Sequence, residues 1–436
     1  MKFVSKAISR WKHFKAMQPT TVNYGIDGLL VLGAMGIAGN NNNLFALRLG
    51  ATEVQLSLLH FFPSIFAMVL MMPAGIFTDS LKNKRRMITA SMLSAAIFYM
   101  IVALSPFAPF NAPPVYFFLI FVGLASVSIN GIYNLAWQAF FPEAVPEESR
   151  NHVLTFRARM TMIVSMLAPL TVGIVLFMVR DEDNKIITHQ AFYVLAAALV
   201  LGNLFHFRKI TATSPTPPKR VSFTEMKAAS KRLANSKQFI FFTLAILLFH
   251  MAWHFDWTLY FITQATYLQM NDFLLNLTPV AGMTAQLLTI KYWSKRSAKH
   301  ESDRPLTFGI FGLALNPIAV IVATSLPAPF GIPTFLVLHF VATLAFANVT
   351  LNVFQSLLKV VDNEYRSFFI AIYSCLIMLS NALMPRIGVG VYNGFGGGLR
   401  ALQLAFVVAF AIRITAGGLW ILRVRYFEKY TKRITV

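Results

Sequence analysis

Ionisable side chains lie inside one apolar segment of the chain, LLFHMAWHFDWTLYF. His250 and His254 are one helical turn apart and share a face, whereas Asp256 is rotated by about 200° from His254. A carboxyl group in hydrocarbon costs a few kcal/mol, so Asp256 is a functional-site candidate by default. We predict that Asp256 binds and releases protons, with the two histidines as further proton carriers. The alternatives are a structural ion pair of Asp256 with Arg413 or Arg386, and histidines that only pack between helices.

Amide and aromatic side chains form a second group of candidates. Four consecutive asparagines, Asn40 to Asn43, must either unwind the helix that holds them or turn a subset towards a cavity. Two other asparagine pairs have the i, i+4 spacing of a stripe along one helix face, and their alternative role is hydrogen bonding between helices. The predicted contacts to an uncharged organic ligand are Asn40, Asn42, Asn43, Asn130, Asn134, Trp137, Trp253, Trp257, Gln264, Asn348 and Asn352.

The elements that position these residues are apolar spans. Because 56% of the residues are hydrophobic and only 13% are charged, a soluble enzyme is excluded. The apolar runs are continuous rather than alternating, which predicts helices and not a membrane barrel. The expected fold class is an all-α integral membrane protein with twelve transmembrane helices. The expected spans are 22–48, 53–77, 87–106, 114–139, 152–179, 189–208, 238–268, 272–293, 305–326, 331–357, 366–392 and 400–422.

The net charge of +21 is explained by the membrane rather than by nucleic acid, because the basic residues fall in short blocks between spans. If the N-terminus lies on the cytoplasmic side of a cell membrane, only five of the Lys and Arg residues fall on the outer side. They are Arg48, Arg180, Lys185, Arg386 and Arg400. Both termini are therefore expected in the cytoplasm. A count of helical rise places Asp27 about 33 Å from the outer end of its span, as a solvated carboxylate at the inner surface. The single Cys375 and the absence of ligand spacing predict no disulfide, metal or cofactor.

The chain is expected to contain two related bundles. We expect two six-helix bundles at 22–208 and 238–424, joined by a basic linker at 209–237. An interfacial helix is expected at 1–21 and a basic tail at 425–436. At an offset of 216 residues, Glu148 aligns with Glu364 and Arg150 with Arg366; near an offset of 219, Glu53 aligns with Asp272. Parallel repeats with a site at their interface are a transporter architecture.

The loop PAGIFTDSLKNKRRMI resembles the G-x-x-x-D-R-x-G-R-R loop of the major facilitator superfamily. The resemblance implies that Asp79 locks one conformational state near the start of the eleventh helix; the alternative is a solvated turn. A second cluster, at the start of spans five and eleven, is similar to a cytoplasmic gate. The predicted gating residues are Gly75, Asp79, Lys84, Arg85, Arg86, Glu148, Arg150, Arg157, Glu364 and Arg366.

These features predict a secondary active transporter of a small organic solute, coupled to protons and acting as a monomer in the lipid bilayer. Ala168, Pro169 and Gly173 resemble the proline and glycine run of proton-coupled exporters, so efflux is preferred and an uptake symporter is the alternative. A non-transporting sensor and an intramembrane enzyme are disfavoured. The sequence contains no G-x-x-x-x-G-K-[ST] loop for ATP.

Overall fold

The computed structural model describes residues 19–108, 113–212, 223–300, 303–361 and 366–434. The described chain is helical, and twelve of its helical segments are long and apolar enough to cross a membrane. The predicted all-α fold with twelve spans is confirmed. The predicted N-terminal interfacial helix falls almost wholly outside the described residues.

The first six spans form the N-terminal half. In chain order, its elements are α2 (Pro19–Ala38), η1 (Gly39–Asn41), α3 (Asn42–Arg48), α4 (Glu53–Ser80), α5 (Arg85–Ala103), η2 (Ser105–Phe107), α6 (Pro114–Ser126), η3 (Val127–Tyr133), α7 (Asn134–Ala144), α8 (Glu147–Met178) and α9 (Glu182–Phe207).

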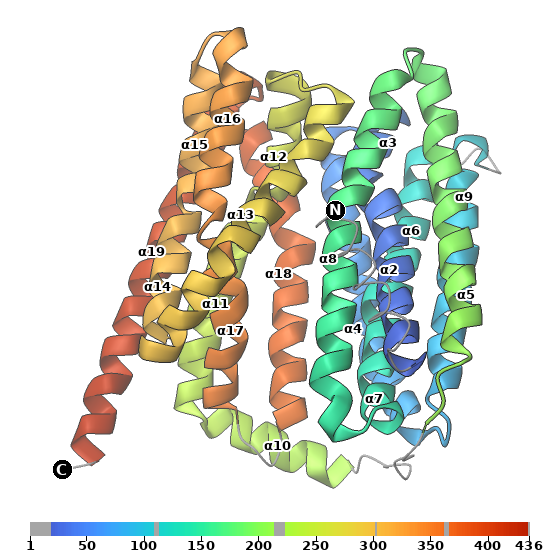
Figure 1. Ribbon diagram of the computed structural model, residues 1–436. Helices are drawn as coiled ribbons and strands as arrows, with labels where there is room; N and C mark the ends of the chain where they lie inside the picture. Colours follow the sequence, from blue (N-terminus) through green and yellow to red (C-terminus); the bar gives the residue numbers. More distant parts are fainter. Residues whose placement is uncertain (1–18, 109–112, 213–222, 301–302, 362–365, 435–436) are drawn as a thin grey trace, which may run out of the picture.

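Helix α10 (Phe223–Asn235) follows and crosses one end of the bundle, at the bottom of Figure 1. We call this the linker end and the opposite end, at the top, the distal end. The C-terminal half contains α11 (Lys237–Phe255), α12 (Trp257–Ile262), η4 (Thr263–Tyr267), α13 (Asp272–His300), α14 (Asp303–Leu313), α15 (Leu315–Ser325), α16 (Ala328–Thr343), α17 (Phe346–Val360), α18 (Arg366–Gly394) and α19 (Gly398–Ile434).

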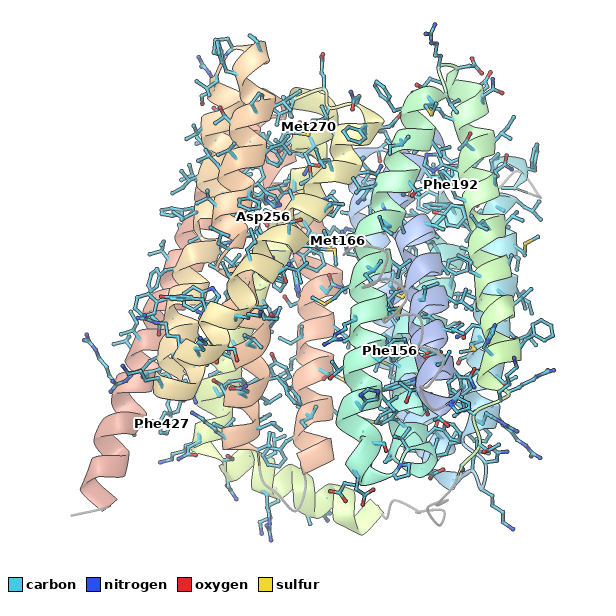
Figure 2. All side chains as sticks on the ribbon, viewed as in Figure 1. Phe156, Met166, Phe192, Asp256, Met270 and Phe427 are labelled. Carbon is cyan, nitrogen blue, oxygen red and sulfur yellow. The ribbon has the colours of Figure 1, made fainter. Side chains whose placement is uncertain are left out.

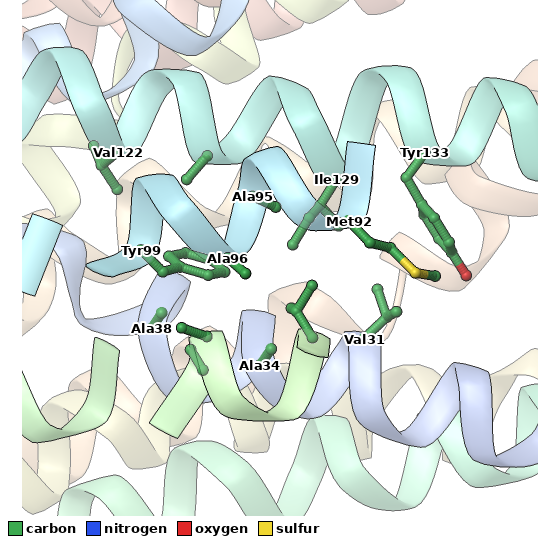
Figure 3. Packing of buried hydrophobic residues seen from close by; sticks show 14 of the residues in the cluster. Val31, Ala34, Ala38, Met92, Ala95, Ala96, Tyr99, Val122, Ile129 and Tyr133 are labelled. Atoms are coloured by element: carbon green, nitrogen blue, oxygen red, sulfur yellow. The ribbon is translucent and has the colours of Figure 1, made fainter. Parts of the chain in front are cut away.

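The two halves contact each other chiefly through two helix pairs, α4 with α18 and α8 with α13. Within the N-terminal half, small side chains let the helices approach closely. Ala34 and Ala38 of α2 belong to the same buried cluster as Ala95 and Ala96 of α5 (Figure 3). The boundaries predicted for the two bundles remain a prediction; they fall beside the end of α9 and the start of α11.

Spans one, four, seven and ten are interrupted, as is span nine at Ala314. A 3₁₀ turn at Gly39–Asn41 breaks span one, and this local unwinding was one of the two alternatives expected from the asparagine run. Span four contains the π-helical segment η3, and span ten divides between α16 and α17. Span seven breaks at Asp256 and becomes π-helical in η4. Discontinuous helices at equivalent places in two repeats are where transporters build binding sites.

The repeat is also visible in two ion pairs at the linker end. Lys84, before α5, pairs with Glu143 of α7 at 2.5 Å. Asp303, at the start of α14, pairs with Lys359 of α17 at 3.8 Å. Lys84 corresponds to Asp303 at an offset of 219 residues, and Glu143 corresponds to Lys359 at an offset of 216. Each half therefore joins the start of its third span to the end of its fourth span, and the two pairs have opposite charges at equivalent positions.

Close packing at the break in span seven gives a stability prediction. A Cβ at Gly388 of α18 would overlap the carbonyl oxygen of Phe255, whereas nothing lies within 4 Å of a Cβ at Gly390. Gly388→Ala should therefore cost about 1–3 kcal/mol through overpacking. Thermal unfolding in detergent should show a lower melting temperature for Gly388→Ala than for the matched control Gly390→Ala. Equal melting temperatures would contradict this packing.

Candidate functional site

A cavity of about 280 Å³ lies where the N-terminal half meets α13 of the C-terminal half. Its polar lining consists of two amides, two hydroxyls and a phenol: Asn42, Asn130, Ser126, Ser165 and Tyr99. The first two are among the residues predicted to bind substrate. The cavity thus combines side chains from spans one, three, four and five at the interface between the halves.

The interrupted helices position the two amides. Asn130 lies in the π-helical segment η3, is exposed, and donates a hydrogen bond from Nδ2 to Ser126 Oγ at 3.2 Å. π-Helical segments are frequent at functional sites. Asn42 follows the 3₁₀ turn and accepts a hydrogen bond from Tyr193 OH at 2.6 Å. Asn134 donates to the backbone oxygen of Asn130 and so supports the segment.

The apolar wall of the cavity contains side chains from both halves. Leu32, Met35 and Val122 come from the N-terminal half, and Pro279 and Met283 from α13. Methionine is flexible and polarisable, and it fits ligands of varied shape. Gly36 also lines the cavity, and a Cβ there would lie 2.8 Å from Ala168 Cβ, so α2 and α8 are in close contact at this level.

The other predicted amides lie elsewhere. Asn348 and Asn352 are fully buried; Asn348 donates to the carbonyl oxygen of Pro305, and Asn352 donates to Asn348. This is the helix-to-helix hydrogen bonding that was the alternative interpretation. Asn43 Oδ1 is buried without a hydrogen-bond partner, and the side chain of Asn40 lies outside the described residues.

The aromatic candidates divide between the halves. Trp137 of α7 packs on Tyr24 and receives the guanidinium of Arg157 over its ring at 4.3 Å. Trp253 and Trp257 contact each other edge-on along span seven, with centroids 5.6 Å apart. Gln264 lies in the π-helical segment η4, where its backbone oxygen accepts from Met270 N.

Asp256 forms a buried ion pair deep in the C-terminal half (Figure 2). Both of its oxygens accept from Nη2 of Arg413, at 2.8 and 2.7 Å, and Nη1 of Arg413 donates to the carbonyl oxygen of Leu313. The exposed fractions of the Asp256 and Arg413 side chains are 0% and 1%. The pair lies between two separate apolar clusters of this half. Arg413 is one of the two ion-pair partners that the sequence suggested for Asp256.

The predicted histidines face away from that pair, towards α18 and the N-terminal half. His254 Nδ1 is 3.0 Å from Ser380 Oγ, and the His250 and His254 rings are 5.4 Å apart. Trp257 lies between His254 and His60 of α4, with ring centroids 4.6 and 5.1 Å away. The contacting rings of His254, Trp257 and His60 therefore cross the interface between the halves.

The prediction for Asp27 was wrong. Its side chain is fully buried rather than solvated at the surface. Asp27 Oδ1 accepts from Tyr133 OH at 2.6 Å and from Asn203 Nδ2 at 2.8 Å, and Oδ2 accepts from Nε of Arg157 at 3.2 Å. A count of helical rise gives depth along the axis, but it does not show which neighbouring helices cover a side chain.

An ion-pair cluster joins the halves at the distal end; we call it the distal latch. Asp272 of α13 accepts from Arg48 Nη2 at 2.7 Å and lies 3.1 Å from Lys185 Nζ, so one carboxylate of the C-terminal half is held by two cations of the N-terminal half. Glu182 pairs with the same two cations. The buried His189 Nε2 lies 2.7 Å from Arg48 Nη1.

A related contact lies on the other side of the interface. Glu53, which the repeat aligns with Asp272, accepts from Tyr392 OH at 3.4 Å, and Tyr392 OH is 2.7 Å from Tyr267 OH. Asn41 and Asn276 also bond across the halves at 3.2 Å. The sequence analysis did not propose Glu53 or Asp272 as contacts between the halves, although their alignment in the repeat was a signal that could have identified them.

The predicted gating residues at the linker end act mainly within the N-terminal half. Lys84 pairs with Glu143, Arg85 donates to the backbone oxygens of Arg208 and Ile210, and Arg150 donates to those of Val145 and Pro142. Gly75 packs near Leu135, whereas Arg86 and Glu148 are exposed. Glu364, and the side chains of Asp79 and Arg366, lie outside the described residues, so the lock at Asp79 remains a prediction.

The fold and the cavity define a helical membrane transporter with two six-span halves around a central site. The family model described as Major Facilitator Superfamily matches residues 28–385. The chain belongs to this superfamily and is a transporter rather than an enzyme. The resemblance inferred from the loop after span two is confirmed.

Solved transporters share the fold at low sequence identity. The chain is similar to a bacterial homologue of the human lysosomal transporter Spinster in an inward-facing, unoccupied conformation (13% identity, TM-score 0.67, covering 94% of this chain and 96% of that one). It is also similar to the nucleoside transporter NupG, as a D323A mutant (14%, 0.69, 93% and 99%), and to a D-xylose-proton symporter (14%, 0.65, 91% and 96%). A search of curated proteins finds no match.

The distal latch gives a prediction about conformation. Asp272→Asn removes the carboxylate that holds Arg48 and Lys185, and it should shift the balance towards a distal-open state by about 2 kcal/mol. Spin labels are attached at the exposed positions 107 and 393 in a Cys375→Ala background. Electron paramagnetic resonance should show a longer distance between the two labels in Asp272→Asn than in the parent protein.

The matched control is Glu182→Gln, because the Glu182 side chain is 68% exposed and surface ion pairs contribute about 0–1 kcal/mol. An Asp272→Asn distance distribution identical to that of the parent protein would show that this pair does not hold the halves together.

The buried pair of span seven gives a prediction about stability. Arg413→Leu leaves the Asp256 carboxylate buried without a partner and should cost about 3–5 kcal/mol. Asp256→Asn combined with Arg413→Leu removes both charges and should recover most of that loss. Urea or thermal unfolding in detergent measures both variants; no recovery in the double variant would show that the loss does not come from the unpaired charge.

Proposed function

We propose that this chain is a secondary active transporter that moves a small organic solute through the cavity by alternating access. One observation carries the proposal: the cavity lies between two related halves whose distal ends are joined by ion pairs and hydrogen bonds that rigid-body rocking can break. Such rocking around a central site is how repeat transporters alternate access. The reversible contacts are those of Asp272 and Glu53.

The distal end corresponds to the outer face of a cell membrane if the basic linker faces the cytoplasm, as the distribution of Lys and Arg favours. The latched arrangement is then the state closed to the outside, and the protein works as a monomer. Export is the preferred direction and uptake the alternative. Gly173, which is part of the exporter-like run, lets α8 and α13 approach closely, because a Cβ at this position would lie 2.8 Å from Asn276 Cβ.

Proton coupling is part of the proposal, and the geometry favours Asp27 over Asp256 as the carrier. A proton carrier must meet water during the cycle. The Asp256 and Arg413 side chains are sealed inside one half, with a two-oxygen contact. Arg157 keeps 17% of its side chain exposed and touches Asp27 through Nε alone. The other titratable groups facing Asp27 are the hydroxyls of Tyr24 and Tyr133.

Reconstitution in liposomes tests the function and the carrier together. Flux of a nucleoside and of D-xylose, the solute types of two structural neighbours, is measured with and without an imposed pH gradient. Asp27→Asn should abolish accumulation driven by the gradient while keeping solute exchange. Asp256→Asn combined with Arg413→Leu, which removes both charges of that buried pair, should keep both. If only the double variant lost gradient-driven accumulation, proton coupling would be assigned to Asp256 instead. Channel-like turnover above about 10⁶ per second would exclude a carrier.

A further inference from the structure

We propose that the solute held in this cavity is uncharged and compact, and that it has both hydrogen-bonding groups and apolar surface. This inference rests on the proposed transport function and narrows its substrate class. It follows from the charges of the described bundle, from the groups that line the cavity, and from its size.

The first observation is that the cavity offers no charge. None of the twelve described residues that line it is Asp, Glu, Lys, Arg or His. A charged ligand would therefore leave water for a site without a counter-ion beside it. Burying an ion in this way is far more costly than burying a hydrogen-bonded neutral group.

The second observation is that the buried charges elsewhere in the bundle already have partners. In the described part of the chain, each buried Asp, Glu, Lys or Arg forms a salt bridge. The pairs are Asp27 with Arg157, Lys84 with Glu143, Asp272 with Arg48, Asp256 with Arg413, and Asp303 with Arg423. Outside the distal latch, where Asp272 has two cationic partners, a charged solute could recruit a counter-ion from these groups only by leaving the other member of a pair uncompensated.

The third observation is the chemistry of the lining. Asn130, Ser126 and Ser165 supply amide and hydroxyl groups to the lining of the cavity, while Met35, Val122 and Met283 supply apolar surface. A cavity of about 280 Å³ is slightly smaller than the ~300–1,000 Å³ typical of ligand sites, so it selects a compact molecule.

Cysteine labelling tests this selectivity without knowledge of the substrate. Ser165→Cys is made in a Cys375→Ala background, and Asn393→Cys, at an exposed position of α18, is the control. Each variant reacts with three thiosulfonates: methyl (neutral), trimethylammonium-ethyl (cation) and sulfonatoethyl (anion). For each reagent, the rate at position 165 is divided by the rate at position 393. This ratio should be at least about tenfold larger for the neutral reagent than for either charged reagent.

A second variant checks the physical cause. Asn130→Asp, added to Ser165→Cys, places a carboxylate in the lining and should raise the relative rate of the cationic reagent while lowering that of the anionic one. Equal rates for all three reagents at position 165, no reaction there at all, or no response to Asn130→Asp would overturn the inference. Labelling does not depend on transport. Charge exclusion without solute flux in liposomes would therefore refute the proposed function alone, and flux with equal labelling rates would refute the substrate class alone.

Discussion

The pairing of buried charges is the interaction on which this structure depends, and the position of each pair determines what it stabilises. Asp256 with Arg413 and Asp27 with Arg157 lie within one half, where each fixes helices that must move as a unit. Asp272 with Arg48 joins the two halves, so it favours one relative position of those units. Because an unpaired charge in this environment is costly, the first two pairs favour rigid halves and the third can serve as a reversible contact.

The breaks in the spans complement this rigidity. Spans one, four, seven and ten each depart from regular α-helix, and the breaks in spans one and four bring Asn42 and Asn130 to the central cavity. Irregular backbone at membrane depth is tolerated where it is buried in protein or lines a cavity. The same irregularity therefore supplies hydrogen-bonding groups to a site that contains no charge, while the ion pairs stay outside its lining.

Span number, helical class and the two-fold repeat could be predicted from the sequence, because apolar length and residue offsets are local or one-dimensional signals. The unwinding at Asn40 to Asn43 and the pairing of Asp256 with Arg413, as one of two alternatives, could also be predicted. The burial of Asp27 could not, because its partners Tyr133, Arg157 and Asn203 come from three other helices. The role of Asp272 was missed although the repeat aligned it with Glu53, because an acid at a span end looks like an ordinary solvated terminus.

The reversed polarity of the two linker-end pairs bears on how the halves assemble. A duplicated protein risks intermixing, in which the third span of one copy docks on the fourth span of the other. Here such exchange would set Lys84 against Lys359 and Asp303 against Glu143, so both mismatched contacts bring like charges together. The reversed signs therefore favour pairing within each half over pairing between the third span of one half and the fourth span of the other.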